Sequence, residues 1–168
     1  MPNYLAGDIV LVRGYGLASR LIRFFTRSML ERPTIVNHVG VMVDSEHIVE
    51  SLNKTVYRKL SDGYSKDSVY YVVRRLDLTN GQRHTIAAKA SSYIGRSYGW
   101  WKILAHGVDR LLGNRYLFRR LARMDKYPIC SWVVAYSYKQ VSLNFGVPPW
   151  ATDPDDIYDY CMEKDSKQ

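Results

Sequence analysis

The sequence predicts an α+β fold in which a mainly antiparallel sheet packs against helices. Short runs rich in β-branched and aromatic residues dominate the first half of the chain, whereas helical patterns dominate the second half. The breaks between the runs after residue 34 are too short to hold helices, so neighbouring strands must pair in antiparallel fashion. Strands grouped before helices are typical of α+β proteins.

The expected strands follow one another closely after the first of them. Turn-forming residues separate the later runs, among them the Asp-Ser and Asn-Lys pairs that follow Val43 and Leu52. The strands are expected at 8–13, 35–43, 47–52, 55–60 and 68–76.

The expected helices are identified by apolar residues at helical spacing and by their end signals. Arginines alternate with apolar residues in the first of them, which Pro33 ends, and Asp153 followed by Pro154 is an N-cap signal for the last. An almost wholly apolar helix begins at or just before Cys130, which marks it as central and buried. The helices are expected at 17–30, 84–94, 101–112, 116–124, 129–141 and from 153 to about 164.

Length and composition indicate one domain over residues 1–168, with a helical basic insert at about 96–126. The two cysteines, Cys130 and Cys161, lack metal-ligand spacing, so we expect free thiols, no metal and no other cofactor. No secretory signal or membrane-spanning run is visible, which predicts a cytoplasmic protein. A phage-borne protein delivered by other means, or one held at a membrane surface, remains an alternative.

The formal net charge of +8 is unevenly distributed, because basic residues cluster at 13–32 and 110–126 while the segment 153–165 is acidic. Such clusters suit an anionic membrane surface or another polyanion. Solvated helix faces are an equally good interpretation. Nucleic acid is the least favoured partner, because no nucleic-acid-binding motif accompanies the charge.

Cys130 is the candidate nucleophile. A thiol reacts as thiolate, and the N-terminus of a helix lowers the pKa of a thiol placed there. Cys130 stands at the expected start of the central helix, after Pro128. The alternative is a small apolar residue that only fills the core.

His38 is the candidate base. Of the four histidines, only His38 lies inside an apolar strand, where an unused imidazole would be costly to bury. His47 falls at a turn, and His84 and His106 fall on expected helix surfaces. A hydrogen-bonded core histidine is the alternative for His38.

Glu50 is the candidate carboxylate that orients the histidine. It lies in an apolar run one strand after His38 and could accept the second imidazole N–H. A two-residue turn between the strands would place Glu50 opposite Val41 and turn it away from His38. A shared face therefore requires a three-residue loop or a bulge.

The segment Asn37-His38-Val39-Gly40-Val41, with a carboxylate twelve positions after the histidine, resembles the HVGI strand of the NlpC-type papain-like superfamily. In ordinary members the cysteine helix precedes this strand, whereas here it follows. The order is similar to the circularly permuted branch that includes YiiX-like hydrolases and, more distantly, lecithin retinol acyltransferase relatives. The segments that also match are Gly7-Asp8-Ile9-Val10, Ile48-Val49-Glu50-Ser51, Tyr93 to Tyr98, and Cys130-Ser131. Trp132 departs from the pattern, because a glutamate is usual after Cys-Ser.

The resemblance implies a permuted papain-like fold and acyl transfer by a cysteine amidase or peptidase through a thioester. It implies Cys130, His38 and Glu50 as catalytic residues, with Tyr98 and Ser131 near the substrate or oxyanion. A packing role for Tyr98 is the alternative. Peptide amides of the cell-wall type, such as peptidoglycan stem peptides, are the first substrate class, and lipid acyl esters or amides at a membrane surface are the second. A binding protein for polyanions without enzymatic activity is the third interpretation.

Overall fold

The computed structural model describes residues 3–15, 35–64, 68–75, 77–113, 117, 120 and 126–165. Five antiparallel strands form one sheet in the order β4-β3-β2-β1-β5, so the α+β class is confirmed. The strands are β1 (Ile9–Gly14), β2 (His38–Met42), β3 (His47–Ser51), β4 (Thr55–Lys59) and β5 (Ser68–Val73). The helices are α2 (Asn80–Ser91), α3 (Trp100–Leu111), α5 (Cys130–Lys139) and α6 (Pro154–Asp165), with a short 3-10 turn, η1 (Leu60–Asp62).

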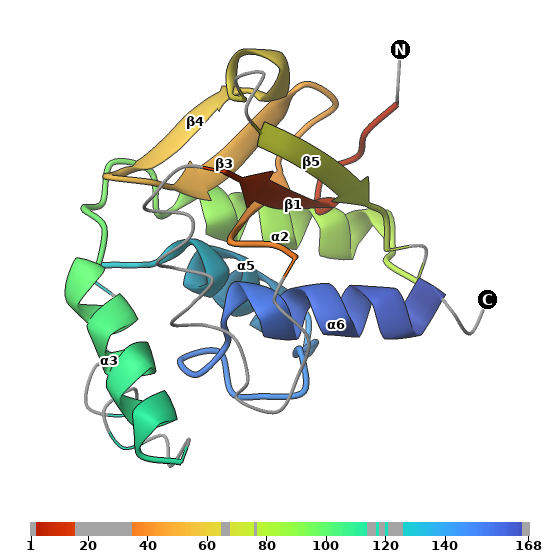
Figure 1. Cartoon of the computed structure of the whole chain (residues 1–168). Coiled ribbons are helices and arrows are strands. Elements are labelled where there is room, and N and C mark those ends of the chain that lie inside the picture. The colour runs from red at the N-terminus through yellow and green to blue at the C-terminus, as the bar shows by residue number, and fades with distance from the viewer. Residues whose placement is uncertain are drawn as a thin grey trace.

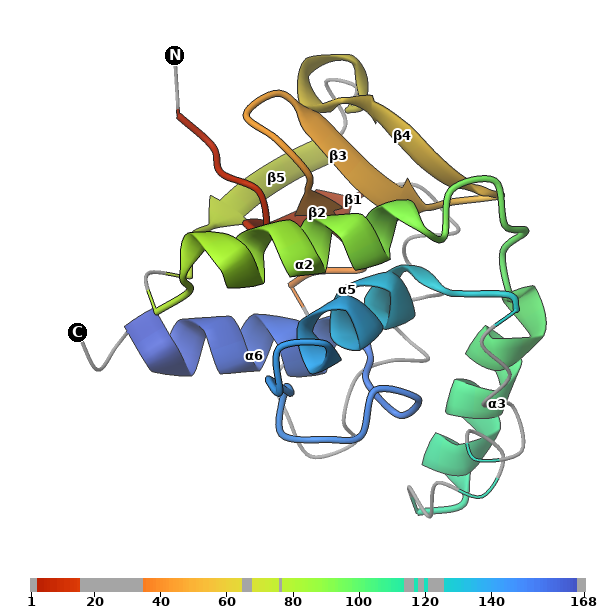
Figure 2. The same cartoon turned by 180° about the vertical axis from the view of Figure 1, so that it is seen from behind.

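The helices α2, α5 and α6 lie on one side of the sheet, with α2 and α5 next to it (Figure 1). The view from behind shows the same layering and places α3 at the edge of the molecule, away from the sheet (Figure 2). The described residues 126–129 lead into α5 on the side of the molecule where α3 lies (Figure 2). The start of α5 therefore lies between the layered part of the molecule and α3.

Two apolar clusters hold this arrangement together, one on each face of the sheet. Because successive strand residues point to opposite faces, β1 supplies Ile9 and Leu11 to the cluster under the helices and Val10 and Val12 to the other. The central helix α5 adds eight buried residues to the core side. This burial explains why the segment 130–141 is almost wholly apolar.

Two helix starts are set by side-chain caps. Asp153 accepts from the amides of Asp155 and Asp156, which confirms the N-cap expected for α6. The expectation that α2 begins at His84 is wrong, because α2 begins at Asn80. Thr79 caps it in a reciprocal capping box with Gln82.

The helix α3 exposes apolar residues and buries polar ones, which is the reverse of a usual surface helix. Its Trp100, Trp101 and Leu104 are exposed, whereas Lys102 and His106 are buried. The expectation that His106 lies on a helix surface is therefore wrong: the imidazole is 1% exposed and faces inward. The side chain of His84, as expected, is exposed on α2.

Two of the expected helices, 17–30 and most of 116–124, lie outside the described residues. The basic cluster at 13–32 also lies outside the described residues, except for Arg13. Within the described ranges, no helix has both the length and the apolar character needed to cross a bilayer.

Candidate active site

His38 and Glu50 meet on the same face of the sheet. In the antiparallel register of β2 and β3, Glu50 pairs with Gly40 and Val41 pairs with Val49. The amide of Val43 donates to the carbonyl oxygen of His47, which leaves a loop of three residues, 44–46, between them. The loop therefore has the odd length that a shared face requires. The Nε2 atom of His38 lies 2.6 Å from Oε2 of Glu50.

Gly40 makes room for this pair. It lies between His38 and Met42 on β2 and directly opposite Glu50. A Cβ atom at position 40 would lie 2.6 Å from Cδ1 of Ile48 and 3.2 Å from Cβ of Glu50. Any side chain there would push the carboxylate or Ile48 out of place.

Two residues that the sequence did not reveal hold the Glu50 carboxylate. Its Oε1 accepts from Nε of Arg58 at 2.5 Å, and its Oε2 accepts from the hydroxyl of Tyr64 at 2.8 Å. Burial raises the pKa of Glu50, but the hydrogen bond and charge of His38, followed by Arg58 and Tyr64, lower it to about 2. Glu50 is therefore an ionised carboxylate although its side chain is fully buried.

The ionised carboxylate decides how the His38 ring is used. A carboxylate accepts hydrogen bonds only, so Nε2 must carry the hydrogen, and Nδ1 is left for Cys130. Burial lowers the pKa of His38, but the charge and hydrogen bond of Cys130, together with those of Glu50, raise it to about 10. The ring is thus an imidazolium at neutral pH.

The Cys130 thiol has the opposite shift. Burial raises its pKa, but the charge and hydrogen bond of His38, together with the hydrogen bonds of the Val39 amide and of Tyr98, hold the pKa below its ordinary value. The side chain is the first of α5, after Ile129 in extended conformation as N-cap residue. Helix-end amides favour negative charge at this position. The geometry supports a thiolate paired with an imidazolium.

The sulfur sits where the sheet opens between β2 and β3. Their pairing ends at Gly40 and Glu50, so the amide of Val39 lies beyond the paired part and hydrogen-bonds to Cys130. On the β3 side, the hydroxyl of Ser51 donates to the carbonyl oxygen of Pro128 at 3.1 Å. This bond ties the segment before α5 to the end of β3.

Tyr98 also reaches Cys130, as the resemblance implied. Its hydroxyl donates to the sulfur, which lowers the pKa of the thiol, and accepts from the backbone amide of Cys130. Burial and the nearby sulfur raise the pKa of Tyr98, so it stays a neutral donor. Its ring also contacts Trp100, with centroids 4.8 Å apart.

Ser131 lies next to Cys130 in the chain and lines the small pocket that adjoins the sulfur, but its hydroxyl is engaged with the backbone. Its buried hydroxyl donates to the carbonyl oxygen of Thr152 at 2.8 Å. This bond fixes α5 against the segment that leads into α6. A role for Ser131 at the substrate stays a prediction.

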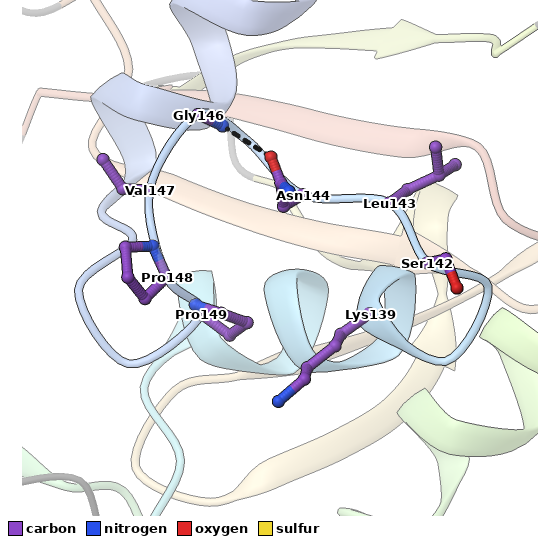
Figure 3. Close-up of a pocket in the computed structure, with 8 residues that line it drawn as sticks. All are labelled: Lys139, Ser142, Leu143, Asn144, Gly146, Val147, Pro148 and Pro149. Carbon is purple, nitrogen blue, oxygen red and sulfur yellow. Dashed lines mark hydrogen bonds between the residues drawn. The ribbon is translucent and has the colours of Figure 1, made fainter.

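A small pocket adjoins the sulfur, between α3 and the N-terminal ends of α5 and α6. Its lining includes Tyr98, Ile103, Cys130 and Pro154. A larger pocket of about 500 Å³ lies at the other end of α5, around Lys139 and the loop that follows (Figure 3). The residues that line this larger pocket include no carboxylate, imidazole or thiol, and Lys139 is the charged side chain among them.

Neither Cys130 nor Cys161 forms a disulfide, and Cys161 is buried in the core. Among the residues that the structure describes, no group of three or more His, Cys, Asp or Glu side chains is placed to hold a metal ion.

No protein-family model matches the chain, and no curated protein is similar to it. A solved structure is similar: the metalloprotein yiiX of Escherichia coli O157:H7, described as DUF1105. The identity is 19%, the TM-score is 0.62, and the match covers 87% of this chain and 71% of that chain. At this level of identity, the similarity shows a YiiX-like fold alone.

Proposed function

We propose that this chain is a cysteine hydrolase that cleaves amides or esters through a thioester on Cys130. The observation that carries the proposal is the contact of Cys130 with His38, which lowers the pKa of the thiol and helps to raise that of the imidazole, with Glu50 hydrogen-bonded behind the ring. A buried thiolate with a proton donor beside it is the arrangement that acyl transfer needs. The YiiX-like fold and the resemblance of the His38 strand support the same class.

In the first step, the sulfur of Cys130 attacks the carbonyl carbon of the substrate, and the C–S bond forms. The negative charge moves to the carbonyl oxygen. The backbone amide of Cys130 and the hydroxyl of Tyr98 already hydrogen-bond to each other. Either group can donate to an oxyanion at this position once the substrate displaces the contact between them.

In the second step, the C–N or C–O bond breaks and the Nδ1 proton of His38 passes to the leaving amine or alcohol. The product is a thioester on Cys130 and a neutral imidazole. Water then gives one proton to Nδ1 and its hydroxide to the acyl carbon. The C–S bond breaks, a carboxylic acid is released and the thiolate–imidazolium pair is restored. Glu50 stays ionised throughout and keeps Nε2 protonated.

Peptide amides of the bacterial cell-wall type are the substrate class that we favour. The support for this choice is the similarity of the Asn37 to Val41 segment to the NlpC-type strand. The pocket beside Cys130 is small, so the scissile bond must reach the sulfur with few atoms around it.

Lipid esters or amides are a second candidate, because the same residues would cleave them. The observation that favours lipids is the place of α3: its Ile103 lines the pocket at Cys130, and its outer face is apolar. Polyanion binding without catalysis has support only from the charge of the sequence.

An activated acyl ester tests the reaction class without knowledge of the natural substrate. The full chain is mixed with p-nitrophenyl acetate, and acetylation at each cysteine is followed by mass spectrometry. We expect rapid acetylation of Cys130 and slow turnover, both lost in Cys130→Ser. Cys161→Ser is the matched control, since it removes the other buried thiol and should keep full activity.

Acetylation of Cys130 no faster than that of Cys161, or nitrophenol release that survives Cys130→Ser, would refute the proposal. The substrate class is then tested with two panels, peptidoglycan stem peptides and acyl lipids. Release of an amine from the first and not from the second supports the favoured class.

A further inference from the structure

The outer face of α3 is apolar and open to solvent. Leu104 is 64% exposed, and both tryptophans of the first turn are exposed as well. Val108 and Leu112 continue this face along the helix. At 100° per residue, these side chains fall within about one third of the circumference.

The opposite face of α3 is polar and buried. Lys102, His106 and Asp109 are each at most 1% exposed, and the ammonium group of Lys102 lies 3.5 Å from the ring centroid of Trp132. A surface helix usually turns its apolar stripe toward the core. In α3 the polar face is turned toward the interior of the protein, so the apolar face is turned toward solvent.

The chain that continues from α3 is basic. Residues 110–126 contain six basic residues and a single acidic one, Asp125. Arg120 and Lys126, both in the described part of this segment, are exposed. An exposed stripe of tryptophan and leucine next to a run of arginines suits a surface that is apolar inside and negatively charged outside.

We propose that the apolar face of α3, formed by Trp100, Trp101, Leu104, Val108 and Leu112, docks the protein on an anionic lipid bilayer. The helix lies in the plane of the interface, with Trp101 and Leu104 at the boundary between head groups and acyl chains. Tryptophan favours this depth because its ring is apolar and its N–H is polar. Arg120 and Lys126, the exposed basic residues described after α3, bind the head groups.

A second copy of the chain fits this face less well. Each copy carries a net charge of +8, so pairing the faces would bring two basic segments together. The position of α3 at the edge of the molecule leaves the face accessible to a flat surface (Figure 2). The docking does not rest on the proposed hydrolase, so Cys130→Ser should bind lipid as the unmodified chain does.

Sedimentation with vesicles tests the docking. The full chain is mixed at low salt with vesicles of phosphatidylcholine alone or with added phosphatidylglycerol. We expect binding that grows with the anionic fraction and weakens with salt. The double variant Trp101→Ser, Leu104→Ser should bind at least about 10-fold more weakly, because it removes apolar area from the interface.

The matched control is Tyr57→Ser with Tyr71→Ser, which removes two exposed aromatic side chains from the sheet and should bind unchanged. Quenching of tryptophan fluorescence by brominated lipid gives a second readout on the unmodified chain. Absence of binding at low salt, or equal binding of both double variants, would overturn the proposal. A dimer in solution that only the α3 variant disrupts would assign the face to a second copy instead.

Discussion

The Nε2 atom of His38 and the Oε2 atom of Glu50 lie 2.6 Å apart although twelve residues separate them in the chain. A three-residue hairpin loop and the missing side chain of Gly40 produce this contact. The carboxylate fixes the imidazole so that its other nitrogen serves Cys130. The reactivity that we propose for the sulfur therefore depends on Glu50, which acts on the sulfur through His38.

Substitution Glu50→Gln should lower the pKa of His38. The substitution removes the charge that helps to raise this pKa to about 10. NMR titration of the imidazole nitrogens measures the change directly, and Glu46→Gln, at an exposed carboxylate paired with Lys59, is the control. An unchanged His38 titration in Glu50→Gln would show that the carboxylate does not act on the ring.

Substitution Gly40→Ala should destabilise the fold by about 1–3 kcal/mol, the usual cost of overpacking. The added Cβ would meet Ile48 at 2.6 Å and Glu50 at 3.2 Å. Urea unfolding measures the loss. Gly81→Ala is the matched control, because a Cβ atom at position 81 would meet no atom within 4 Å and alanine favours a helix. Equal stability of the two variants would contradict the close packing at Gly40.

Substitution Tyr98→Phe should slow acylation of Cys130 by roughly 100-fold, the order of loss known for one oxyanion donor. The Phe ring keeps the contact with Trp100, but loss of the hydroxyl contacts with the sulfur and amide of Cys130 should lower the free energy of unfolding by about 1–3 kcal/mol. Single-turnover kinetics with the activated ester give the rate, with Tyr71→Phe as an exposed control. If the stability falls while the acylation rate holds, Tyr98 has only a packing role.

The stability of the protein should fall toward both ends of the pH scale. Glu50 has a folded pKa of about 2 against an ordinary value of 4.5, so its contribution is present above pH 4.5 and is lost as the pH falls through 2. His38 has a folded pKa of about 10 against 6.5, so its contribution is present below pH 6.5 and is lost as the pH rises through 10.

Urea unfolding over this pH range checks both signs. The acid loss should shrink in Glu50→Gln, and the alkaline loss should shrink in Cys130→Ser, where the partner charge of His38 is absent. An acid loss of the same size in Glu50→Gln would assign it to other carboxylates.

The sequence was sufficient for the five strands, because alternation is a local property, but it left the pairing of His38 with Glu50 dependent on a three-residue loop or a bulge. The contacts of Arg58 and Tyr64 with Glu50 were not predicted from the sequence. Arg58 falls on the Glu50 face by the same alternation, since Val56 pairs with Glu50, so its position could have been predicted. Tyr64 follows η1 in an irregular segment, and no sequence periodicity predicts the direction of its side chain.

The inverted helix α3 shows where sequence reasoning fails. Its apolar spacing predicts a helix correctly, but the rule that apolar faces point inward misassigns His106 to the surface. Tertiary contacts decide the matter: Lys102 packs on Trp132, a residue of α5. The spacing of residues within one helix does not show which residues of another element will pack against it. The start of α2 was missed for a smaller reason, the capping box at Thr79.

The rate of Cys130 alkylation by iodoacetamide as a function of pH tests the central claim most directly. We predict rapid reaction of Cys130 at neutral pH, well ahead of Cys161, with a midpoint below the ordinary cysteine value of 9.0. In His38→Gln the midpoint should rise and the advantage over Cys161 should disappear at neutral pH. A Cys130 that reacts no faster than Cys161, with the midpoint of an ordinary thiol, would contradict the account.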